Sequence, residues 1–256
     1  MLLRLIELGR PIDEVIFCDT YKEFPQMYKH VEKIKQYIES LNIKFTILKS
    51  PKSFDEWMFD YEPIRRNPEQ FHEKYGEKAS GKGWPTPTAR WCTGTFKVKI
   101  VEKYIKDFPK RTVVHQYIGI AADETKRLDR INAKKGNKIY PLVEWNWTEI
   151  DALEYCYAQG YDWDGLYEIF DRVSCWCCPL QSLEELRKLR KHFPELWQEL
   201  RDMDKRTWQS FRKDFTVEQL EIRFALEEER KQLGLSTHDR EFFNEMKKKF
   251  EEKEGS

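Results

Sequence analysis

The chain carries no excess of charge of either sign. Its 256 residues include 45 Lys and Arg and 45 Asp and Glu, so the formal net charge is zero. This balance excludes the broad basic field that drives non-specific binding to nucleic acids or membranes. Any site that binds an anion must therefore be local.

Long apolar runs are also absent. Mean hydropathy is −0.79 and 35% of the residues are charged, and no apolar run approaches the ~18 residues that a transmembrane helix needs. The first residues do not have the layout of a secretory signal peptide. We therefore expect a soluble, cytoplasmic protein. The length suffices for one large domain, or for one domain with a smaller helical appendage.

Cysteine is too scarce for a disulfide scaffold, because the chain contains only six. Clustered thiols in a reducing cytosol indicate metal binding or redox chemistry instead. Cys18, in an apolar run, and Cys156, among aromatic residues, are expected to lie in the core. The other four include three within the segment 174–179, and they are the candidate metal ligands: Cys92, Cys175, Cys177 and Cys178.

The spacing of these thiols favours an iron–sulfur cluster over zinc. Thiolates at positions i and i+3 of a tight turn can bind one soft metal ion or cluster, and a distant thiolate such as Cys92 can complete the site. A zinc ribbon would supply two Cys-x-x-Cys pairs, whereas this chain has one pair and a single distant cysteine. Cys177 is either the fourth ligand or only a neighbour. The alternative interpretation is that the thiols pack in a core.

Hydrophobic periodicity predicts an α/β fold. Apolar runs at 15–18 and 45–48 read as buried strands, and the spacing of apolar residues over 23–41 predicts a helix between them. Strand, helix and strand in this order form a βαβ unit with a parallel sheet. The other expected elements are helices at 1–8, 95–105 and 148–159, a strand at 113–118, a long irregular segment at 60–88, and two to four helices over 182–253.

Polar residues follow two of the expected strands. Ligands of open α/β sheets bind outside the carboxyl ends of the strands, where this chain places Asp19-Thr20 and the segment 119–124. Asp19 could accept hydrogen bonds from a ribose hydroxyl or a purine amino group, or it could cap the next helix. Gly119 would allow a ligand to approach the backbone, or it simply ends the strand.

Cations lie close in sequence to Cys92 or to Gly119. The planar guanidinium of arginine binds phosphate and sulfate oxygens well, so these residues predict a local anion site if they converge. Taken singly, each is more often part of a solvated helix surface. The six are Arg90, Lys97, Lys99, Lys126, Arg127 and Arg130.

Taken together, these motifs resemble the phosphoadenosine phosphosulfate (PAPS) reductase family over roughly residues 1 to 185. The matching segments are 16–20, 23–25, 87–93 with Lys97, 119–127, 140–142 with Trp145, and 175–179. The resemblance implies a Rossmann-like parallel sheet of the adenine nucleotide α-hydrolase type over 1–180, with a helical C-terminal region over 181–256. It also implies a nucleotide at the strand ends and a [4Fe-4S] cluster at the cysteines.

The resemblance also assigns roles to residues. Asp19 and Thr20 would hold the adenosine, and Gly119 and Glu124 would lie beside the nucleotide. The phosphate and sulfate oxygens would be bound by Arg90, Lys97 and Arg127. The substrate would be an adenylyl or phosphoadenylyl sulfate, and the thiols would lie beside the sulfur that reacts.

Two departures from the family pattern bear on the reaction. Members begin with a strand and a Ser-Gly-Gly-Lys-Asp-Ser type loop that binds phosphate, whereas this chain opens on the following helix, so we expect either a longer natural protein or a shortened relative. No cysteine follows Cys178 to act as the nucleophile, so a thiol reductant such as thioredoxin would supply it. The alternatives are an ATP-dependent sulfurtransferase acting on DNA or tRNA, and a non-catalytic nucleotide-binding module.

Overall fold

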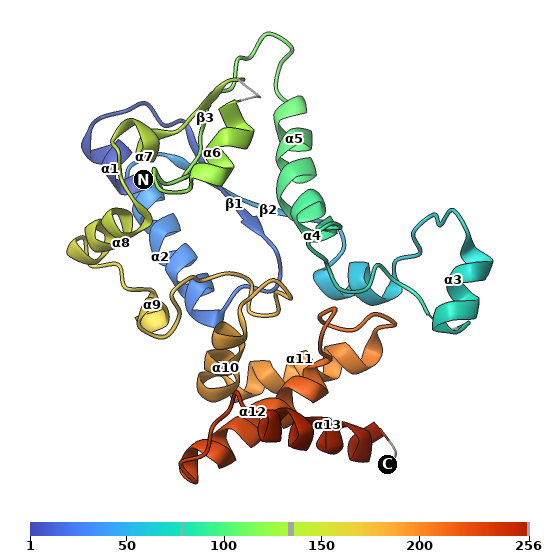
Figure 1. The fold of residues 1–256 in the computed structure, drawn as a ribbon. Coiled ribbons are helices and arrows are strands. Elements are labelled where there is room, and N and C mark those ends of the chain that lie inside the picture. Colours follow the sequence, from blue (N-terminus) through green and yellow to red (C-terminus); the bar gives the residue numbers. More distant parts are fainter. Residues whose placement is uncertain (78, 133–135, 255–256) are drawn as a thin grey trace. The chain divides into compact units, whose positions relative to one another are not determined.

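The computed structural model describes residues 1–77, 79–132 and 136–254 (Figure 1). The chain forms two compact units. Unit 1 comprises Met1–Ser50 and Thr93–Glu168, and unit 2 comprises Pro51–Cys92 and Ile169–Ser256. Each unit is thus built from two separate segments of the chain. The expected boundary between domains near residue 180 stays a prediction, because the division into two compact units does not test it.

The centre of unit 1 is the βαβ unit that the apolar runs predict. Strand β1 (Glu14–Asp19) pairs in parallel with β2 (Lys44–Lys49), and helix α2 (Pro25–Ser40) connects them. Asp19 and Lys49 stand opposite each other at the carboxyl ends of the two strands. Ile38 of α2 is fully buried. The α/β fold class is confirmed, as a largely helical chain with small parallel sheets.

The remaining elements of unit 1 are short. The strand expected at 113–118 extends only over β3 (Gln116–Tyr117). Val113 is 66% exposed, so it gains little from burial and does not stabilise a longer strand. β3 pairs in parallel with β4 (Lys138–Ile139). The helices are α1 (Leu2–Glu7), η2 (Gly94–Val98), α5 (Lys99–Lys106), α6 (Thr125–Asn132), α7 (Pro141–Glu144), α8 (Glu149–Ala158) and η3 (Trp163–Gly165). Two further helices contain a boundary between the segments of the two units: α4 (Trp91–Thr93) and α9 (Leu166–Ile169).

Helix α8 begins where the sequence predicts. Thr148 accepts a hydrogen bond from the Asp151 backbone N–H at 3.2 Å, and the Asp151 carboxylate accepts one from the Thr148 N–H at 2.8 Å. This reciprocal arrangement is a capping box, which satisfies two backbone donors at the start of the helix.

We expect Thr148→Ala to lower the free energy of unfolding by about 1 kcal/mol, the usual cost of removing a capping side chain. Urea unfolding followed by circular dichroism measures this change. Thr148→Ser keeps the hydroxyl and should remain close to the wild type. Equal loss in both variants would contradict the capping role.

Unit 2 contains a helix that sequence reasoning missed. The sequence predicts an irregular segment over 60–88, but α3 (Pro68–Tyr75) lies within it. Pro68 begins the helix instead of breaking it, because the first helical position needs no backbone N–H donor. The other helices of unit 2 are η1 (Glu56–Asp60), α10 (Leu183–His192), α11 (Pro194–Arg206), α12 (Val217–Gln232) and α13 (Arg240–Glu254).

Helices α10 to α13 form the orange-to-red part of Figure 1. Their buried residues include Leu186, Leu200, Phe224 and Phe242. No helix in the described part of the chain is long and apolar enough to cross a membrane.

Candidate nucleotide and thiol sites

The carboxyl end of β1 holds a buried acid. Asp19 is 4% exposed and Thr20 is 3% exposed. One Asp19 oxygen accepts hydrogen bonds from the Tyr21 backbone N–H and from the Tyr28 hydroxyl, both at 2.8 Å. The other oxygen forms an ion pair with Lys49 at 3.0 Å. The carboxylate is therefore held by neighbours from its own strand end, from β2 and from α2.

The turn after β1 is shaped by these bonds. Tyr21 has φ of 66°, a left-handed conformation that the bond from its N–H to Asp19 stabilises. The Thr20 hydroxyl donates to Glu23 at 2.8 Å. Asp19 does not cap the following helix, because α2 begins at Pro25 and Phe24 is its N-cap residue. Burial and the neighbouring Asp19 carboxylate raise the pKa of Tyr28, so its hydroxyl stays protonated and can donate.

The segment after β3 contains a second pair of predicted residues. Glu124 accepts from the Ala121 backbone N–H at 3.2 Å, and Arg127 forms an ion pair with the same carboxylate. A Cβ atom placed on Gly119 would lie 3.7 Å from the Met1 side chain. Glu124 and Arg127 thus bind each other, and an anion that binds Arg127 would compete with that carboxylate.

One predicted cation of unit 1 lies near the end of β1. Burial raises the pKa of the Cys18 thiol, and the charge of Lys97 opposes this rise. Lys97 is therefore within electrostatic range of the residue that precedes Asp19. Lys99 and Lys126 are exposed, and the side chain of Arg130 lies outside the described residues. Arg90 belongs to unit 2.

The cysteine cluster of unit 2 forms a tight turn. The Cys178 N–H donates to the Cys175 carbonyl at 3.1 Å, and the Gln181 N–H donates to the Cys178 carbonyl at 3.2 Å. Cys175 and Cys178 are half-buried, whereas Trp176 is 3% and Cys177 is 1% exposed. The turn therefore separates the thiols at positions i and i+3 from the buried one between them.

Residues distant in sequence come together around Cys178. Burial is the largest cause of the raised pKa of its thiol, and the neighbouring Cys92 adds to the rise. A backbone N–H of Leu180 donates to the sulfur, and the charges of Arg90 and Arg172 oppose the rise. Cys92 and Arg90 therefore lie within electrostatic range of Cys178.

Two residues of this site were missed by sequence reasoning. Arg172 carries a charge close to Cys178, and its position just before the cysteine turn was the available signal. Gln181 donates from its side-chain amide to the Cys175 carbonyl at 3.1 Å and to the Ser174 hydroxyl at 3.3 Å. Its amide oxygen is buried without a hydrogen-bond partner. Gln181, which follows the turn, thus binds the residues that begin it.

The donor chemistry of this site fits an iron–sulfur cluster. All six cysteines are thiols, and a sulfur that accepts a backbone N–H, as Cys178 does, is typical of cluster ligands. Within the described residues, no three His, Cys, Asp or Glu side chains are arranged to hold a metal ion. Cys92 lies within electrostatic range of Cys178, and the assignment of the four cysteines as ligands stays a prediction.

Comparison with known proteins identifies the family of the chain. Residues 1–181 match the phosphoadenosine phosphosulfate reductase domain. An uncharacterized protein of Methanocaldococcus jannaschii is 28% identical over 205 residues, which are 77% of this chain and 37% of that protein. A second uncharacterized protein of this archaeon is 24% identical over 201 residues, 75% of this chain and 42% of that protein.

A relative that is named for its activity is more distant. The adenosine phosphosulfate reductase of Bacillus cereus is 20% identical over 181 residues, which are 70% of this chain and 68% of that enzyme. The chain spans about two fifths of the length of the two archaeal relatives. No solved structure matches the chain.

Proposed function

The chain belongs to the phosphoadenosine phosphosulfate reductase family, and from this premise we propose that it acts on the sulfur of an adenylyl or phosphoadenylyl sulfate. One observation carries the proposal: Cys92, Arg90 and Arg172 lie within electrostatic range of Cys178. Thiols and guanidinium groups at one place suit a reaction in which a sulfonyl group carries negative charge.

The nucleotide would be bound by unit 1. Asp19 and Thr20 end a parallel strand, the usual position of ligand contacts in such sheets, and Lys97 lies within electrostatic range of that end. Asp19 accepts two hydrogen bonds and forms an ion pair with Lys49. A ribose hydroxyl or a purine amino group would therefore have to share or displace one of these partners.

The thiols would hold a [4Fe-4S] cluster. Cys92, Cys175 and Cys178 are the ligands that we propose, and buried Cys177 is the candidate for the fourth position. When bound, the cluster would supply a fixed electrostatic environment beside the reacting sulfur. Arg90 and Arg172 would orient the sulfonyl oxygens and stabilise their charge as the bond to the nucleotide breaks.

The nucleophile would come from a second molecule, since residues 179–256 contain no cysteine. A thiolate of a dithiol reductant, such as thioredoxin, would attack the sulfur of the nucleotide sulfate, forming a sulfur–sulfur bond. The sulfur–oxygen bond breaks, and the nucleotide phosphate leaves with the electron pair. The second thiol then displaces sulfite and closes a disulfide, so that two electrons pass from the dithiol to the sulfonyl group.

The metal content tests the thiol site. Full-length protein purified without oxygen should contain about four iron atoms and about four acid-labile sulfides per chain. Cys178→Ser should lower both by roughly tenfold or more, because a ligand is lost. Cys156→Ser is the matched control, since this half-buried thiol belongs to unit 1 and its loss should leave the iron unchanged. Iron near zero in the wild type would remove the cluster from the proposal.

The product tests the reaction. The wild type with adenosine phosphosulfate and a dithiol should release sulfite, whereas Arg172→Met should release it at least about tenfold more slowly, as expected when a charged group that stabilises the transition state is lost. Pyrophosphate release from ATP that depends on DNA or tRNA would instead establish the sulfurtransferase. Lack of any adenine nucleotide binding in calorimetry would refute both reactions.

A further inference from the structure

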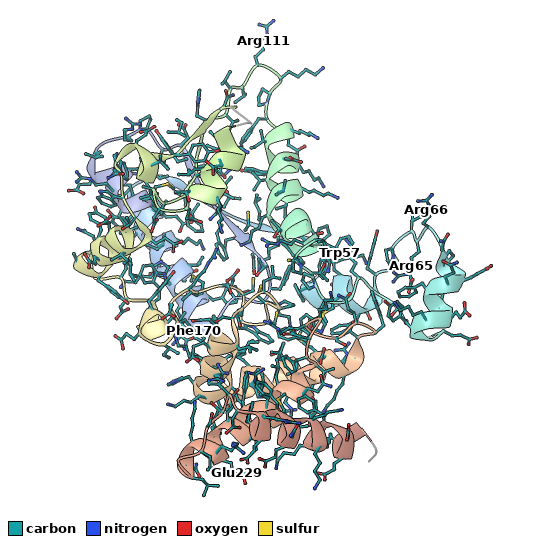
Figure 2. All side chains as sticks on the ribbon, in the orientation of Figure 1. Trp57, Arg65, Arg66, Arg111, Phe170 and Glu229 are labelled. Atoms are coloured by element: carbon teal, nitrogen blue, oxygen red, sulfur yellow. The ribbon has the colours of Figure 1, made fainter. Side chains whose placement is uncertain are left out.

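A lysine of unit 2 is surrounded by three aromatic rings. The Lys82 ammonium lies 4.3 Å from the ring centre of Trp57, 5.1 Å from that of Tyr61 and 5.5 Å from that of Trp91. Trp57, labelled in Figure 2, and Tyr61 pack against each other with ring centres 4.3 Å apart. A cation near the faces of several rings is held by the ring quadrupoles. We refer to Trp57, Tyr61 and Trp91 as the ring cage.

The backbone fixes Lys82 against helix η1. The Lys82 N–H donates to the Trp57 carbonyl and the Gly83 N–H donates to the Met58 carbonyl, both at 3.1 Å. These bonds set the position of Lys82 independently of its ammonium. The ammonium can therefore hold the rings in place. Trp57 lies in η1 and Tyr61 directly follows that helix.

The third ring connects the cage to the thiol site. Trp91 directly precedes Cys92, and both belong to α4. The Trp91 indole N–H donates to the Gly83 carbonyl at 3.1 Å, and its ring centre lies 5.1 Å from that of Phe54. With its ring bound on several sides, Trp91 cannot move without breaking these contacts, and the backbone of Cys92 is held with it.

We propose that Lys82, acting through the ring cage, is a positioning residue that places Cys92 beside Cys178. The inference deepens the proposed function, because the thiol pair it positions belongs to the cluster site. The cage rings and Lys82 all lie in residues 51–92, whereas Cys178 comes from the other segment of unit 2. The ring cage thereby fixes one partner of a pair whose members are far apart in sequence.

A bridging reagent measures the pairing without any metal. The full-length protein, stripped of metal and reduced, would be treated with dibromobimane, which becomes fluorescent when it joins two thiols. Peptide mass spectrometry would identify the fraction joined between Cys92 and Cys178. Lys82→Met should lower the bridging rate by about fivefold, the effect of losing a cation–π contact of ordinary strength.

Matched variants separate positioning from general damage. Lys82→Arg keeps a cation for the rings and should restore bridging. Lys74→Met is the control, because Lys74 lies 5.0 Å from the ring centre of Tyr75, a residue of the same unit that does not belong to the ring cage; this variant should bridge at the wild-type rate. Tyr61→Leu removes one ring and should slow bridging less than Lys82→Met. Circular dichroism would confirm that each variant is folded.

Several outcomes would overturn the inference: wild-type bridging in folded Lys82→Met, an equal loss in Lys74→Met, or no Cys92–Cys178 bridge in the wild type. If Lys82→Met does not fold, Tyr61→Leu takes its place, and wild-type bridging in folded Tyr61→Leu would overturn the inference. In protein loaded with iron, Lys82→Met should change the electron paramagnetic resonance spectrum of the reduced cluster, and Lys82→Arg should restore it. A wild type that bridges the two thiols but binds no iron would refute the cluster and leave the positioning role intact.

Discussion

Replacing Glu227 by Gln is expected to lower the free energy of unfolding by about 3–5 kcal/mol, the usual cost of breaking a buried ion pair from one side. Glu227 is 3% exposed. It accepts from two nitrogens of Arg187 at 2.6 and 2.9 Å and from Arg223 at 2.8 Å. Glutamine would leave two guanidinium groups beside a neutral side chain that returns only part of these bonds.

Urea unfolding of Glu227→Gln and of a control on the same helix measures this effect. Glu229, labelled in Figure 2, is mostly exposed and lies 3.9 Å from Lys249. Such exposed pairs contribute little, so Glu229→Gln should change the free energy of unfolding by less than about 1 kcal/mol. Similar losses in the two variants would show that the buried network has no special role.

The same network sets a dependence on pH. Burial alone would raise the pKa of Glu227, but hydrogen bonds from Arg187 and Arg223 outweigh it and the pKa falls below its ordinary value of 4.5. The folded state therefore favours the charged carboxylate. Its contribution to stability is complete above about pH 4.5 and is lost as the pH falls through the lower pKa of the folded state. Glu227→Gln should lose this part of the acid sensitivity.

The second large effect is expected for Gly81→Ala, which should cost about 3 kcal/mol or more, because a left-handed backbone and overpacking add their costs. Gly81 has φ of +72°, and a Cβ atom there would lie 1.9 Å from the Met58 carbonyl oxygen. This neighbour is backbone, so it cannot move aside as a flexible side chain would. The segment carrying Lys82 would be pushed away from η1.

Gly76→Ala isolates the effect of the contact. Gly76 has φ of +90°, but nothing lies within 4 Å of its added Cβ atom. We expect a loss of about 1–3 kcal/mol from the backbone conformation alone. The melting temperatures and urea midpoints of the two variants would be compared. A Gly81→Ala protein as stable as Gly76→Ala would mean that the close approach to Met58 relaxes at no cost.

Local patterns explain what the sequence predicts well. The βαβ unit and the capped helix α8 depend on residues that are neighbours in the chain, such as the apolar run before Asp19 and the pair Thr148 and Asp151. The interactions that form these elements involve residues within a short stretch of sequence. Helix α3 was missed because a proline that starts a helix has the same composition signal as one that interrupts it.

The candidate sites depend on tertiary contacts, which cannot be seen in any short stretch of sequence. The pairing of Glu124 with Arg127 turns two predicted ligand residues into partners of each other. Arg172 was missed because its charge matters only once the chain has folded around Cys178. Only the family resemblance relates Cys92 to that turn, because periodicity and spacing carry no long-range information.

The interleaved build of unit 2 has a consequence for synthesis on the ribosome. Trp84, which is 1% exposed, donates its indole N–H to Asp204 at 2.9 Å, and Asp204 also accepts from the backbone of Phe211 and Val217. Residues 51–92 emerge long before these partners exist. At ordinary rates of ~5–20 residues per second, that segment waits several seconds with Trp84 unburied, so chaperones have time to engage the nascent chain there.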